Sequence, residues 1–118
     1  MLWSKRMLST HRLALAPILA IMLWVNPAVA EDPGYALSIK DHKFQPTEIE
    51  IPANQKVALE ISNLDATPEE FESVELRREK VIPGGGRITL SIGPLKPGRY
   101  EFFGDFNPTT ARGHIVVK

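Results

Sequence analysis

The sequence predicts an all-β fold, a Greek-key β-sandwich, over residues 31–118. In several short segments apolar side chains alternate with polar ones, which is the period of a half-buried strand. Clusters of Pro, Gly and Asn separate these segments at the short intervals expected of turns. The chain of 118 residues leaves 88 after the first 30 are set aside, which is the length of one small domain.

The strand pattern begins after residue 34. Leu37 and Ile39 fall on one side of the first segment, with Ser38 and Lys40 on the other. The same alternation predicts further strands in segments 48–51, 57–62, 88–92, 100–103 and 113–117. Turns are expected around 45–46, 52–54, 63–68, 83–86 and 93–98. This spacing is typical of an antiparallel Greek-key sandwich without a repeat or an internal linker.

The segment 67–80 allows two interpretations. Thr67 and Pro68 form a good helix start, because Thr is a favoured N-cap and Pro is favoured at the first helical position. Against a helix, Phe71, Val74 and Leu76 do not repeat at helical spacing. We expect a polar loop followed by a strand over 71–76, with the helix as the alternative.

The first thirty residues predict a signal peptide, residues 1–30, followed by the domain at 31–118. A basic start carrying Lys5, Arg6 and Arg12 precedes the apolar run 13–25, and Ala28-Val29-Ala30 supplies a cleavage site. A membrane-spanning helix needs roughly 20 apolar residues, and Asn26-Pro27 ends this run early. The sequence therefore predicts an exported protein, with an uncleaved N-terminal anchor as the alternative.

The composition of residues 31–118 excludes several functions. Of 14 basic residues in the chain, three precede residue 31, which leaves 11 against 14 acidic residues and gives no reason to expect nucleic-acid binding. The chain has no Cys, and its three Met all lie in the first 30 residues, so the domain has no sulfur ligand for a soft metal. No nucleophile–base pair or phosphate-binding loop is visible, so we expect no organic substrate.

The densest acidic cluster comprises Glu69, Glu70, Glu72 and Glu75. In an extended strand Glu70 and Glu72 project to the same face, because side chains alternate with period two. Two neighbouring carboxylates repel each other unless a cation lies between them. The pair is therefore either a site for a hard cation such as iron, manganese or calcium, or a solvated surface neutralised by Arg77, Arg78 and Lys80.

Two histidines remain in the domain. His42 follows Asp41 in a loop, and this carboxylate could orient the imidazole, so His42 is a candidate metal ligand. His114 alternates with Ile115 and is expected to be an exposed strand residue.

Beyond these patterns, the chain resembles a known family from about Tyr35 to Lys118. Cupredoxin domains open with a segment that resembles HKFQPTEIEIPANQKVALEISNLD. A bacterial periplasmic cupredoxin-like family, whose members accompany high-affinity ferrous iron permeases, is similar in ATPEEFESVELRREKVIPGGG, IGPLKPGRYEFFGDF and TARGHIVV. The resemblance implies a cupredoxin-like sandwich in the periplasm, with a membrane iron permease and its periplasmic components as partners. It also implies a metal site where loops 63–72 and 103–113 meet.

The resemblance also shows which positions of this chain correspond to the ligands of a blue copper centre. A blue copper centre takes one His from the first loop and Cys, His and Met from the second. These positions fall near Pro68-Glu69, Gly104, Asn107 and Arg112 in this chain, so the thiolate is missing and a blue copper centre is excluded. Iron-linked relatives often carry His at Val74 and at Asn107, and this chain lacks both.

The remaining candidate metal ligands are mostly oxygen donors: Glu69, Glu70, Glu72, Glu75 and Asp105, with His42 and Asn107 as additions. We expect an accessory protein of iron uptake that binds iron, or assists ferrous iron oxidation and delivery to the permease. Iron is the expected metal and copper is less favoured. The alternative is a metal-free interaction module that docks to a membrane or periplasmic partner.

Overall fold

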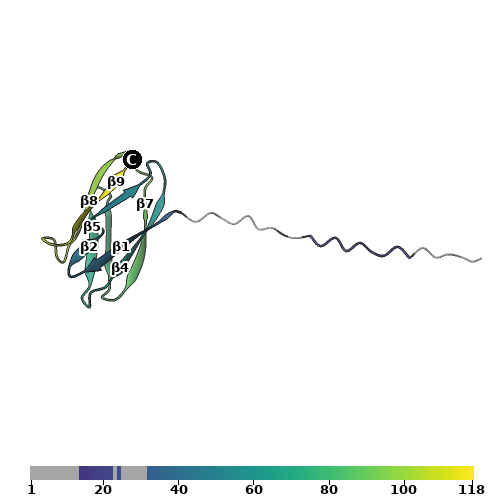
Figure 1. Ribbon diagram of the computed structural model, residues 1–118, viewed down its shortest axis with the longest axis horizontal. Coiled ribbons are helices and arrows are strands. Elements are labelled where there is room, and N and C mark those ends of the chain that lie inside the picture. Colours follow the sequence, from purple (N-terminus) through teal and green to yellow (C-terminus); the bar gives the residue numbers. More distant parts are fainter. Residues whose placement is uncertain (1–13, 23, 25–31) are drawn as a thin grey trace, which may run out of the picture.

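The computed structural model describes residues 14–22, 24 and 32–118 (Figure 1). Residues 14–22 and 24 are exposed and have no regular secondary structure. The rest of the expected signal peptide, with its basic start and its cleavage site, lies outside the described residues. Within the described part of the chain, no helix is long and apolar enough to cross a membrane.

Nine strands form two sheets, and residues 32–118 contain no helix, which confirms the all-β sandwich. The four-stranded sheet has the order β2 (Lys43–Gln45), β1 (Gly34–Lys40), β4 (Val57–Asn63) and β7 (Arg87–Ile92). The five-stranded sheet has the order β3 (Glu48–Ile51), β9 (Arg112–Val117), β8 (Gly98–Gly104), β5 (Glu69–Ser73) and β6 (Arg78–Ile82). The sheets are not purely antiparallel as expected, because β1 pairs with β4 and β3 with β9 in parallel.

The core lies between the two sheets and is centred on three aromatic rings. Phe44, Phe71 and Phe102 are each at most 1% exposed, and their ring centroids lie 5.0–6.2 Å apart. Edge-to-face contacts of this kind add to the free energy of burying the rings. Each ring comes from a different strand, so the cluster joins β2 to the middle of the five-stranded sheet.

The helix considered for segment 67–80 does not form, and the expected strand is shifted. Strand β5 runs from Glu69 to Ser73, a turn over 74–77 follows, and β6 returns over 78–82. The favourable helix start is overridden by tertiary packing, because Phe71 is fully buried in the aromatic core. Strand β6 was not predicted, because four of its five residues are exposed at the edge of the sheet and its sequence therefore does not alternate between apolar and polar residues.

A second short hairpin was also unexpected. Asp41 and His42 link β1 to β2 with φ angles of 52° and 55°, the left-handed conformation of a tight hairpin turn. The carboxylate of Asp65 accepts hydrogen bonds from both backbone amides, at 2.8 and 3.0 Å. These bonds, that of His42 first, lower the pKa of Asp65. The turn is thereby fastened to the loop that precedes β5.

Candidate functional site

Three carboxylates meet on the outer face of the five-stranded sheet. Glu70 and Glu72 project from this face of β5, and Asp105 follows the end of β8, so that one oxygen of each lies within 4.8 Å of the others. The Asp105 amide donates to the Glu70 carbonyl at 2.9 Å, which holds the start of the 105–111 loop against β5. We call Glu70, Glu72 and Asp105 the acidic group. It brings together three of the residues expected as ligands.

A fourth carboxylate borders the acidic group from the neighbouring strand. In the register of β5 and β6, Glu79 lies directly opposite Glu72, and its carboxyl group is the largest cause of a raised pKa at Glu70. Like charges at opposed positions of an antiparallel pair are destabilising. Sequence reasoning missed Glu79, because its place depends on the hairpin of β5 and β6, which was not recognised.

None of these four acids forms an ion pair with a basic side chain of residues 32–118. Arg78 and Lys80 pair with Ser73 and Phe71 across the strands, so they lie on the opposite face of β6 from Glu79. Among residues 32–118, no Lys or Arg nitrogen lies within 4.0 Å of these carboxylates, whereas ion pairs with Lys or Arg hold five other acidic residues. Arg77 and Arg78 nevertheless line a surface hollow together with Glu72 and Glu79, so the solvated charged surface that the sequence left open stays an alternative.

Glu70 is unusually buried for a carboxylate. Its side chain is 8% exposed, and its Oε1 atom is shielded from solvent without a hydrogen-bond partner in the described part of the chain. The hydrogen bond with Glu79, burial, and repulsion from Glu79, Asp105 and Glu72 raise the pKa of Glu70 to about 7. Burial, followed by repulsion from Asp105 and Glu79, raises the pKa of Glu72. Both shifts favour the protonated, uncharged forms of Glu70 and Glu72 when no counter-ion is near.

Glu69, one residue earlier, is separated from the acidic group by the strand itself. Its side chain points into the sandwich and is 1% exposed. Oε1 accepts hydrogen bonds from the amides of Glu70 and Phe106 at 3.0 and 2.9 Å, and Oε2 accepts one from Asn107 Nδ2 at 2.6 Å. Glu69 and Asn107 thus bind each other and anchor the 105–111 loop.

The same contacts show that a copper–thiolate centre does not fit. A Cβ atom added to Gly104, the position expected for the Cys, would lie 2.6 Å from Glu69 Cδ and 2.7 Å from Ala111 Cβ. These separations are shorter than atoms of side chains tolerate. The carboxylate of Glu69 and the methyl group of Ala111 occupy the space that a thiolate would need, in agreement with the missing sulfur.

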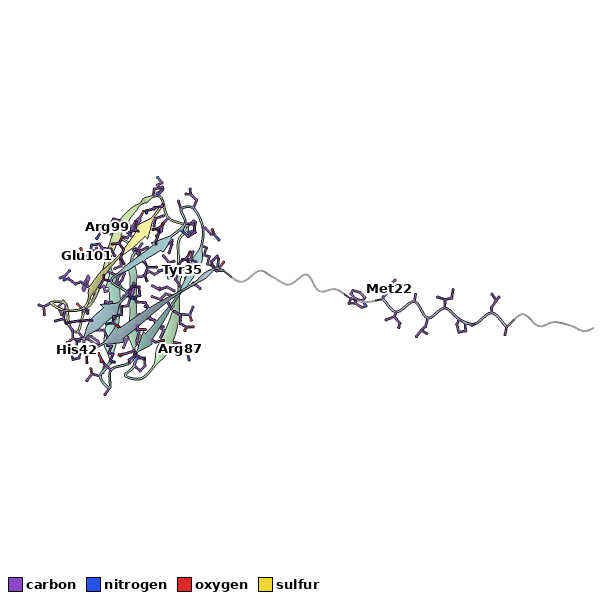
Figure 2. The ribbon with its side chains drawn as sticks, in the orientation of Figure 1. Met22, Tyr35, His42, Arg87, Arg99 and Glu101 are labelled. Atoms are coloured by element: carbon purple, nitrogen blue, oxygen red, sulfur yellow. The ribbon has the colours of Figure 1, made fainter. Side chains whose placement is uncertain are left out.

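The other expected ligands lie elsewhere. Glu75 lies in the turn after β5 and lines a surface hollow of about 200 Å³ with Val74, Glu101, Phe103 and Arg112. His42 directs Nδ1 toward Asp65 Oδ2 at 3.7 Å, rather than toward Asp41. Figure 2 shows His42 at the end of the sandwich away from Arg99. His114 is half-buried on β9, where Nδ1 lies 3.2 Å from Arg99 Nη2.

Comparisons with known proteins agree with this fold. Auracyanin A, a blue copper protein from Chloroflexus aurantiacus, superposes with a TM-score of 0.63 at 12% identity, covering 72% of this chain and 98% of that one. The metal-binding domain of the Cu(I)-exporting ATPase CopA of Streptococcus pneumoniae D39 gives 0.62 at 14% identity, covering 72% of this chain and 84% of that one. At these identities the similarity concerns the fold alone.

A relative closer in sequence is the uncharacterized protein RP394 of Rickettsia prowazekii (strain Madrid E). It is 51% identical over 81 residues, covering 69% of this chain and 65% of that protein, so this chain spans slightly less than two thirds of its length. The family model of the cupredoxin-like domain matches residues 13–117 of this chain. The chain therefore belongs to the cupredoxin-like domain family.

Proposed function

We propose that this protein is an exported iron-binding accessory module that holds a hard metal ion at the acidic group. One observation carries the proposal: Glu70, Glu72 and Asp105 converge with no basic partner within 4.0 Å among the described residues, and Glu70 is almost fully buried among them. Burying an unpaired charge is costly unless a counter-ion compensates it. Protonation would neutralise Glu70 alone, whereas a bound cation would compensate all three carboxylates.

The chemistry of the donors supports iron over copper. The acidic group offers carboxylate oxygens, which suit hard cations, whereas copper(I) prefers sulfur and nitrogen ligands. The position expected for a copper thiolate is filled by Glu69. Ferrous iron is our proposed physiological ligand, and manganese is its air-stable substitute in experiments.

Delivery to a membrane iron permease in the periplasm completes the proposal. Its support is the basic and apolar start of the chain with its Ala-x-Ala step, together with the resemblance to permease-associated domains. An outer-face site suits transfer, because a bound ion would be released without opening the sandwich.

Calorimetric titration of the purified protein with manganese, and with ferrous iron under anaerobic conditions, tests the proposal. We expect one ion per chain, with binding abolished in Glu70→Ala/Glu72→Ala. The matched control is Glu48→Ala/Glu50→Ala, which removes two acids at the same spacing from β3 that are paired with Arg99 and Lys118. Absence of binding by the parent, or equal binding by the first variant, would contradict the site.

A metal-free docking module is the second candidate, and one observation favours it. Val74 is 73% exposed at the rim of the hollow that Phe103 and Arg112 also line, and exposed apolar side chains beside a hollow are common in binding surfaces. Photo-crosslinking from position 74 in cells, compared with position 60 on the other sheet, tests this function. A specific adduct from position 74, together with no metal binding, would favour docking.

A further inference from the structure

Glu79 lies beside the acidic group on the neighbouring strand β6. The hairpin of β5 and β6 places it opposite Glu72, on the same face of the sheet. Its carboxyl group raises the pKa of Glu70 but does not belong to the set whose oxygens all lie within 4.8 Å. Glu79 is exposed, so rotation of its side chain can bring it closer without any change in the backbone.

A second observation indicates a ligand between these acids. Glu70 is more than nine-tenths buried, and its Oε1 atom lacks a hydrogen-bond donor among residues 32–118. Buried polar atoms are almost always satisfied in folded proteins. The charged groups that repel it are acids: Glu72 on its own strand, Glu79 on β6 and Asp105 after β8. Arg77 and Arg78 line a hollow with Glu72 and Glu79, but neither forms an ion pair with an acid of residues 32–118. A cation would satisfy the free oxygen and relieve the repulsion together.

We propose that Glu79 is the fourth carboxylate ligand of this site, and that four carboxylates make it select trivalent hard cations over divalent ones. The inference rests on the proposed function, since it assumes a metal at the acidic group. The attraction between an ion and a ligand set grows with the product of their charges, so a fourth carboxylate adds more to the binding of a trivalent ion. Oxygen-only coordination is the set that hard cations prefer.

Terbium luminescence measures both parts of this inference. Titrating Tb³⁺ into the purified protein gives its affinity, and the emission lifetimes in H₂O and D₂O give the number of water molecules on the bound ion. We expect Glu79→Gln to weaken Tb³⁺ binding about tenfold, the low end of what lost metal-site partners cost, and to add one bound water. Mn²⁺ binding should weaken less. Glu50→Gln, on the opposite edge strand β3, is the control and should change neither quantity.

The outcomes separate this inference from the proposed function. If Glu79→Gln leaves the Tb³⁺ affinity and hydration unchanged while Glu70→Ala/Glu72→Ala abolishes binding, the acidic group is a metal site without Glu79. If the parent binds neither Tb³⁺ nor Mn²⁺, both proposals fail. A purely structural role for Glu79 would shift the thermal midpoint of the metal-free protein without changing the hydration of the bound ion.

Discussion

Replacing Glu69 should weaken the domain far more than replacing an exposed acid. Two hydrogen bonds from the 105–111 loop end on its carboxylate, one from Phe106 N and one from Asn107 Nδ2. Hydrogen bonds to charged groups contribute about 1.5–3 kcal/mol each, so Glu69→Ala removes about 3–6 kcal/mol of favourable interactions. Part of this is recovered because a buried carboxylate no longer has to be desolvated. We expect the free energy of unfolding to fall by about 2–4 kcal/mol.

Glu69→Gln separates the roles of shape and charge. The glutamine oxygen can still accept from the Glu70 and Phe106 amides, and the side-chain amide of Asn107 can rotate to accept from the new NH₂ group. We expect a loss of about 1 kcal/mol. Because a small domain has about 5–15 kcal/mol of stability, both variants should remain folded at room temperature.

Urea unfolding followed by far-UV circular dichroism measures these differences. Glu60→Ala is the control, because Glu60 is a surface residue paired only with Arg87, and its loss should cost less than about 1 kcal/mol. The reasoning would be refuted if Glu69→Ala were as stable as the parent, or if Glu69→Gln had a lower free energy of unfolding than Glu69→Ala.

Three further predictions follow from the same region. Gly104→Ala should lower the free energy of unfolding by about 1–3 kcal/mol through overpacking against Glu69, and in urea unfolding the double variant with Glu69→Ala should lose less than the sum of the single losses. Folding raises the pKa of Glu70 from 4.5 to about 7, so its contribution to stability is complete below pH 4.5 and is lost as the pH rises through 7. In EDTA, the thermal midpoint should therefore decrease as the pH is raised from 5 to 8. Glu70→Gln should make this decrease smaller. Val74→His/Asn107→His should not create a tight copper site in calorimetry. Val74 lies in the turn after β5, and the four residue steps of β5 from Glu69 to Ser73 span about 13 Å, whereas Asn107 contacts Glu69 at the start of that strand. Submicromolar copper binding would contradict this geometry.

The fold could be predicted because its strands are amphipathic. Strands such as β4, whose burial alternates at every residue, were visible as alternation. Strand β6 was not visible, because an exposed edge strand has no buried face to mark it. The pairing direction was also hidden, since the parallel contact of β1 with β4 depends on a crossover between sheets that local patterns do not encode.

The candidate site was predictable only to the extent that it lies on one strand. The period of two places Glu70 and Glu72 on one face, and the structure agrees. The contribution of Asp105 was inferred from the resemblance, and that of Glu79 required the register of an unrecognised hairpin. His42 was expected near Asp41, but its turn is held by Asp65, which is 23 residues away in the sequence.

The two acidic features of the five-stranded sheet come from consecutive residues of one strand. Glu69 faces inward and fills the position where a copper thiolate would lie, and Glu70 faces outward into the acidic group. Because side chains alternate across a strand, a shift of one residue in the pairing of β5 would exchange these roles. It would turn Glu69, the loop anchor, outward and direct the Glu70 side chain into the aromatic core. Phe71, fully buried between the sheets, opposes that shift, so the aromatic core also fixes which carboxylates face outward.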